Sequence, residues 1–148
     1  MKKKQIFFGI LVLSSFLFTN CKSTTNEEEQ ENEVAQGWEK VMAVHDEIMP
    51  ITMKFPPMKD ELTAIADTTT TPEIVEKIKG QITDIDNAYH AMYDWMEDAT
   101  PIGQALEKME TKAGLKRLVD EEARINQVKM ETNQAFENAT KLLEELKK

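Results

Sequence analysis

Methionine and histidine residues on one predicted helix face are the side chains best suited to bind a ligand or a metal. Met42, His45 and Met49 recur at intervals of three and four residues, so a helix would place them on the same side. Met92 and Met96 lie one helical turn apart further along the chain. Thioether and imidazole ligands suit Cu(I), and a methionine with a histidine can ligate haem inside a helical bundle. A copper or haem site on this Met/His face is therefore one hypothesis for the function.

The same residues have a simpler interpretation as packing residues. Met92 and Met96 continue the apolar stripe that includes Ile85, and His45 continues the stripe that begins at Trp38. Methionine is unbranched and fills irregular gaps in hydrophobic cores. We therefore predict that the Met/His face packs in the core and that the protein holds no cofactor, with copper or haem binding as the alternative.

Two other groups of charged residues could act together. Asp86, His90 and Asp94 are spaced by four residues, so they could offer two carboxylates and an imidazole to a divalent ion. Ordinary surface pairs on a helix have the same spacing, and we prefer that interpretation. The charged residues within 121–124 could form a layer that sets the register of the helices, or they could face solvent.

Sequence motifs for covalent or phosphate chemistry are missing. The chain has no Gly-x-Ser-x-Gly sequence and no glycine-rich phosphate loop. Carboxylates are frequent in a chain with 27 Asp and Glu residues, so their spacing carries little information. We therefore predict that the protein is not an enzyme.

The lone cysteine, Cys21, follows a segment with the features of a bacterial export signal. Three lysines at positions 2–4 precede an apolar run over residues 6–18, which is shorter than the roughly 20 residues that span a bilayer. The order of charge, apolar run and cysteine resembles a bacterial lipobox. That resemblance implies that residues 1–20 are a signal peptide and that Cys21 receives acyl chains such as palmitate. It also implies an envelope protein anchored by its lipid, in the outer membrane, facing the periplasm or the cell surface.

The segment that follows the cysteine is polar and acidic. Residues 22–32 (KSTTNEEEQEN) contain no apolar side chain, so we predict that residues 21–32 are a lipidated cysteine and a disordered tether. Lys22 with the acidic run also resembles an export signal for surface lipoproteins, and a solvated spacer is the alternative. Without the three signal-peptide lysines, 15 basic and 27 acidic residues would remain, a formal charge of −12. Such a charge disfavours nucleic-acid binding.

Beyond the tether, apolar residues recur every three or four positions, which indicates helices. The predicted helices cover residues 33–50, 58–66, 72–99 and 104–146, with Gly114 a candidate interruption of the last. No segment alternates with the period of two that strands require. We therefore predict an all-α antiparallel bundle of three long helices plus a short extra helix, over residues 33–148.

The predicted domain also resembles a family of short bacterial lipoproteins, some of which are labelled viral A-type inclusion protein. The resemblance covers about residues 34–146. It lies in residues 38–50 (WEKVMAVHDEIMP), in residues 91–96 (AMYDWM) and in the glutamate-rich last helix. It implies a helical lipoprotein and brings no activity and no site residues. The predicted function is therefore a structural or interaction role at the envelope, with an unidentified protein partner.

Overall fold

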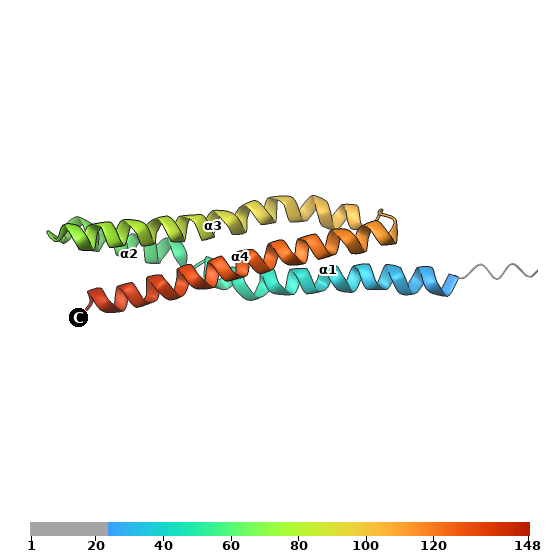
Figure 1. Ribbon diagram of the computed structural model, residues 1–148, viewed down its shortest axis with the longest axis horizontal. Helices are drawn as coiled ribbons and strands as arrows, with labels where there is room; N and C mark the ends of the chain where they lie inside the picture. The colour runs from blue at the N-terminus through green and yellow to red at the C-terminus, as the bar shows by residue number, and fades with distance from the viewer. Residues whose placement is uncertain (1–23) are drawn as a thin grey trace, which may run out of the picture.

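Four helices make up the described part of the chain. The computed structural model describes residues 24–148, with side chains from residue 32 onward. The helices are α1 (Thr24–Thr52), α2 (Phe55–Thr68), α3 (Pro72–Leu106) and α4 (Thr111–Leu146). Residues 24–148 contain no strand, and three of the four helices are long (Figure 1). The predicted all-α bundle of three long helices and one short helix is confirmed.

The helices form an elongated bundle in which α4 contacts all the others. Helices α1 and α2 follow one another along the bundle and run in the same direction as α4, whereas α3 runs the opposite way (Figure 1). Helix α1 packs mainly against α4, and α2 packs mainly against α3. The contact between α1 and α3 is much smaller. The seam between α1 and α3 is therefore the loosest of the long-helix interfaces.

The core has two parts, one on each side of the break between α1 and α2. The first lies among α1, the second half of α3 and the first half of α4, and it is centred on Ile48, Trp95 and Ile125. The second lies among α2, the first half of α3 and the second half of α4, where Phe55 and Ile85 are fully buried. Each buried side chain of this size contributes roughly 1.5–3 kcal/mol to the stability of the fold. The pairing of the helices therefore depends on these two parts of the core.

Helix α3 continues past the break that the sequence predicted at residues 100–103. It runs through Pro101 to Leu106, and the actual break is the turn between Leu106 and Thr111. An internal proline costs about 3 kcal/mol because it removes a backbone hydrogen bond. Ala99 and Leu106 are buried on either side of Pro101, and their packing offsets this cost. Gly114, the candidate interruption of the last helix, is buried inside α4 and does not break it.

The start of α1 differs from the predicted tether. Helix α1 begins at Thr24, so residues 24–32 are helical and the prediction of disorder is wrong for them. The segment is rich in glutamate, which has a good helix propensity. The predicted signal peptide over residues 1–20 and Cys21 lie outside the described residues. Over residues 24–148, no helix has both the length and the hydrophobicity to cross a bilayer.

Helix α3 begins at residue 72, where the sequence places it. Pro72 occupies the first turn, and Glu73 lies near the positive helix end. Thr71 is the N-cap residue, and its side chain makes no capping hydrogen bond. The rigid φ of Pro72 and the acidic Glu73 therefore define this helix end without a side-chain cap.

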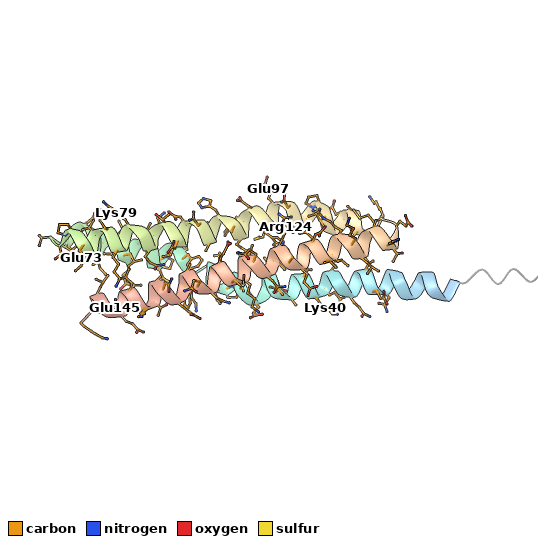
Figure 2. The ribbon with its side chains drawn as sticks, viewed as in Figure 1. Lys40, Glu73, Lys79, Glu97, Arg124 and Glu145 are labelled. Atoms are coloured by element: carbon orange, nitrogen blue, oxygen red, sulfur yellow. The ribbon has the colours of Figure 1, made fainter. Side chains whose placement is uncertain are left out.

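Charged side chains cover the outside of the bundle and link neighbouring helices (Figure 2). Each inter-helix pair has at least one partner that is two-fifths exposed, so each contributes at most about 1 kcal/mol to stability. The pairs connect α1 to α4, α2 to α3, α2 to α4 and α3 to α4. They are Glu47–Lys129, Lys59–Asp86, Glu61–Lys147, Lys77–Glu145 and Asp98–Arg124.

Two glycines test how closely the helices approach one another. An added Cβ at Gly37 would lie 2.6 Å from Cδ1 of Leu118, whereas one at Gly80 would meet nothing within 4 Å. We expect Gly80→Ala to raise the free energy of unfolding by about 0.5–1 kcal/mol, because alanine is the better helix former. We expect Gly37→Ala to lower it by about 1–2 kcal/mol, because overpacking against Leu118 exceeds the same gain. Urea unfolding measures both, and stabilisation by both changes would contradict the close α1–α4 contact.

Candidate functional site

The loose seam between α1 and α3 opens into a groove of about 820 Å³. Helix α1 lines it from Val34 to His45, and α3 lines it from Trp95 to Leu106, with Glu107 directly after the helix. Met109 and Thr111, at the turn into α4, close one end. A volume of this size falls in the usual range of about 300–1,000 Å³ for small-molecule sites.

Small residues opposite large aromatic ones explain why a groove forms here. Gly103 lets the indole of Trp38 lie directly on α3, since an added Cβ would come within 3.0–3.2 Å of that ring. Ala35 and Ala99 also line the groove, and their short side chains leave the space between the helices unfilled. The bulk of the indole therefore sets the spacing of α1 and α3 at this contact, and the short alanine side chains leave the space beside it unfilled.

His45 forms the end of the groove opposite Met109. Its imidazole stacks on Trp95, with ring centroids 5.7 Å apart and planes at 28°. Its Nδ1 lies 2.9 Å from Oδ1 of Asp46, which fits an Nδ1–H that donates to this carboxylate. In the neutral ring this tautomer leaves a lone pair on Nε2.

Two buried nitrogens in the groove wall have no hydrogen-bond partner among the described residues. They are Nε2 of His45 and Nε1 of Trp95. A buried polar group without a partner costs about 1–3 kcal/mol, and such groups are rare in folded proteins. Both atoms are buried beneath the lining surface, on two rings that stack on one another at the His45 end of the groove.

The structure separates the five predicted Met/His residues into two groups. Met42, His45 and Met96 line the groove together. Met92 is 0% exposed and belongs to the core, as its apolar stripe predicted. Met49 packs against the same core and does not line the groove. A single face with all five residues is therefore not formed, because the groove ends at His45 and Trp95.

Other groove residues were not singled out as site residues from the sequence. The sequence pattern places Trp38 in a core stripe and Gly103 at a helix break, and it gives Met109 no role in a site. The available signal was the pair of small residues at positions 99 and 103, one turn apart on α3. Recognising them as groove residues also requires the register of α1 against α3, which no local pattern contains.

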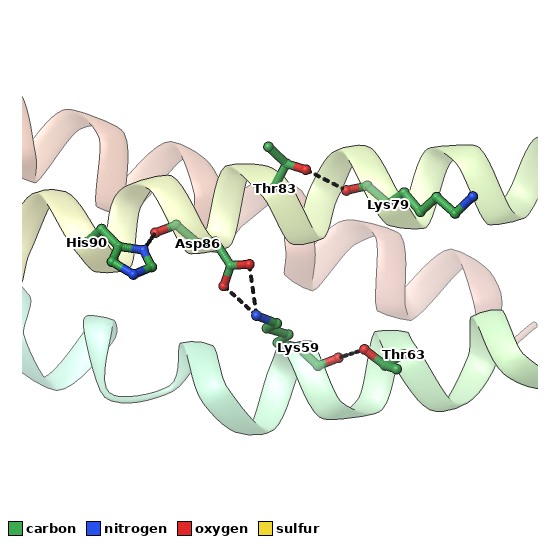
Figure 3. Close-up of polar contacts among 6 residues, drawn as sticks. All are labelled: Lys59, Thr63, Lys79, Thr83, Asp86 and His90. Atoms are coloured by element: carbon green, nitrogen blue, oxygen red, sulfur yellow. Dashed lines mark hydrogen bonds and ion pairs between the residues drawn. The ribbon is translucent and has the colours of Figure 1, made fainter.

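The predicted group of Asp86, His90 and Asp94 does not come together as an ion site. Nζ of Lys59 lies 2.7 and 2.8 Å from the two carboxylate oxygens of Asp86 (Figure 3). Nδ1 of His90 lies 2.7 Å from the backbone oxygen of Asp86. The hydrogen bond of this ring is therefore to the backbone of Asp86 and not to its carboxylate. Over residues 24–148, no three His, Cys, Asp or Glu side chains are placed to hold a metal ion. The carboxylate of Asp86 thus serves the contact between α2 and α3.

The charged layer of α4 is built around a buried carboxylate. Glu121 is 0% exposed, and its Oε1 lies 2.9 Å from Arg117 and 3.2 Å from Arg124. Arg124 also pairs with Asp98 of α3 at 2.6 Å. The hydrogen bond to Asp98 raises the pKa of the Arg124 guanidinium above its usual value, although burial opposes the rise. A charged layer therefore exists, and its Arg124–Asp98 pair links α4 to α3. Glu122 is not part of this layer because its side chain is exposed.

Removing the buried carboxylate of this layer should change the free energy of unfolding differently from removing its arginines. We expect Glu121→Met to leave the free energy of unfolding unchanged or higher, because the methionine needs no partner in the core. We expect the double change Arg117→Met and Arg124→Met to lower it by about 2–3 kcal/mol, since Glu121 would stay buried and unpaired. Both arginines are partly exposed, so the expected loss of stability is small for the breaking of a buried ion pair. Chemical denaturation would contradict the assignment if the single change destabilised more than the double one.

Over residues 24–148, the fold and the site define an all-α bundle with a mainly apolar groove between α1 and α3. No protein-family model, curated protein or solved structure matches this chain at a significant level.

Proposed function

We propose that this chain is a lipid-anchored protein of the bacterial cell envelope that acts by binding, with the groove between α1 and α3 as its binding site. The observation that supports binding is the groove itself, a space of about 820 Å³ whose lining includes the stacked rings of His45 and Trp95. The walls are mainly apolar or thioether surfaces, with two threonines and a glutamine as uncharged polar residues and Glu39 and Glu107 as the charged ones. Such a groove favours a ligand with an apolar body and few polar atoms.

The proposed anchor is supported by the order of residues around Cys21. Each buried methylene of an acyl chain contributes about 0.8 kcal/mol, so more than one chain on this cysteine would hold the protein stably on a membrane. Thr24 lies three positions after Cys21, and Val34 lies ten positions further along the helix. The groove would therefore begin within about 25 Å of the anchored residue. This position suits a ligand or partner that is itself at the membrane.

Binding in the groove can be tested with a neutral apolar dye, Nile red, and the chain from residue 22 onward, which contains every described helix. We expect saturable binding by the wild type. Ala35→Trp should weaken it at least tenfold, because Ala35 lines the groove and is exposed, so the larger ring fills the space without disturbing the core. The matched control is Ala64→Trp, on the exposed side of α2. Fluorescence titration measures both, and equal binding by the two variants would contradict the site.

Metal or haem binding is a second candidate function, and one observation favours it. Met42, His45 and Met96 line the same groove, so one imidazole and two thioethers are available to a single ligand. A visible-range spectrum and a metal analysis of untagged protein purified from its own cells would reveal a bound haem or copper. Protein without haem and with less than a tenth of an equivalent of metal would exclude a permanently bound group.

A further inference from the structure

The imidazole of His45 has the surroundings of a metal ligand. Its Nδ1 is 2.9 Å from the carboxylate of Asp46, and its Nε2 is buried without a partner in the described part of the protein. Histidines that bind metals usually donate their other ring N–H to a carboxylate or carbonyl, which fixes the tautomer and raises the basicity of the ligating nitrogen. Asp46 therefore prepares Nε2 to donate its lone pair.

Two methionines lie at the same end of the groove. The contacts of Trp38 with Gly103 and of His45 with Trp95 fix the antiparallel register of α1 and α3. Met42 precedes His45 by one turn, so it lies between these two contacts, and it lines the groove. Met96 follows Trp95 directly and lines the groove from α3. The register thus places Met42 of α1 and Met96 of α3 at the same end of the groove as His45.

The chemistry of this ligand set selects one kind of ion. Thioether sulfur is a soft ligand that favours Cu(I), whereas Zn²⁺ and the harder divalent ions favour thiolate, several imidazoles or carboxylates. No Lys or Arg lines the groove, and Glu39 and Glu107 are its charged residues, which favours entry of a cation. The residue types of the lining therefore favour a soft cation over anions and hard metal ions at this position.

We propose that the His45 end of the groove binds one Cu(I) ion through Nε2 of His45 and the thioethers of Met42 and Met96. The inference rests on the proposed function in that it assigns a ligand to the groove. It adds Asp46 as a positioning residue that orients the imidazole. Met92 and Met49 are outside the site, although the sequence pattern places them on the same stripe.

The test is an anaerobic titration of the full chain in detergent micelles with Cu(I), in competition with a chelator of known affinity. We expect one equivalent to bind and to raise the melting temperature. The double change Met42→Leu and Met96→Leu conserves side-chain shape and should leave the circular dichroism spectrum unchanged while it weakens Cu(I) binding at least 100-fold. Asp46→Asn should weaken binding 10- to 100-fold, because the exposed Asp46 acts only through the ring of His45.

Met109→Leu is the matched control, because Met109 lines the other end of the groove. It should bind Cu(I) as tightly as the wild type. No Cu(I) binding by the wild type, or equal affinity in the double leucine variant, would overturn the proposal. Nile red separates this failure from failure of the proposed function: a chain that binds the dye in the groove but not Cu(I) loses the metal site and keeps the groove, and a chain that binds neither loses both.

Discussion

Ile85→Asp should unfold the bundle at room temperature. Ile85 is 1% exposed and lies in the second core cluster, where α3 meets α2 and α4. The change removes an apolar side chain and buries a carboxylate among apolar neighbours, which costs several kcal/mol. A domain of this size has a total stability of about 5–15 kcal/mol, so this cost is a large part of it. Far-UV circular dichroism and urea unfolding measure the effect.

The control for this experiment replaces an exposed β-branched residue by aspartate. Val119 is 65% exposed on α4, so Val119→Asp should alter the free energy of unfolding by less than about 0.5 kcal/mol. Two variants that both keep the helical spectrum and the wild-type urea midpoint would contradict the packing of α3 in the core.

Cys21→Ala should abolish the proposed lipid anchor completely. The thiol is the acceptor of the acyl chains in the proposed processing, and alanine offers no acceptor. Cells that express the variant should show no incorporation of radioactive palmitate into the protein, which should become soluble or remain as an unprocessed precursor. Ser23→Ala is the control, because it changes a neighbouring residue and leaves the thiol in place. Equal labelling of the wild type and Cys21→Ala would contradict the anchor.

The sequence predicts the helices well because their apolar stripes are long and regular. Ile78, Ile85 and Met92 recur on one face of α3, and all three are buried. Helix ends are less well predicted, because long-range packing decides them. Pro101 looks like a helix break from the sequence, but burial of Ala99 and Leu106 carries α3 past it.

The groove could be predicted only in part, for a similar reason. Met92 and Met96 have the same local pattern, yet Met92 is buried among three helices and Met96 faces the α1–α3 seam. The difference arises from the contact of Trp38 with Gly103, which joins residues 65 positions apart. Spacing within one helix carries no information about which helix covers each residue. A sequence pattern therefore identifies residue types that could bind a ligand, but it does not show where they form a site.

The two tryptophans of the chain provide the most direct test of the binding groove. Trp38 and Trp95 are the only tryptophans, and both line the groove. Heteronuclear NMR of the chain from residue 22 onward, with 15N-labelled tryptophan, should give two indole N–H signals, which Trp38→Phe assigns. Addition of Nile red should shift both signals with the same affinity that fluorescence reports, because both indoles line the groove. Saturation by the dye with both indole signals unmoved would contradict a binding site between α1 and α3.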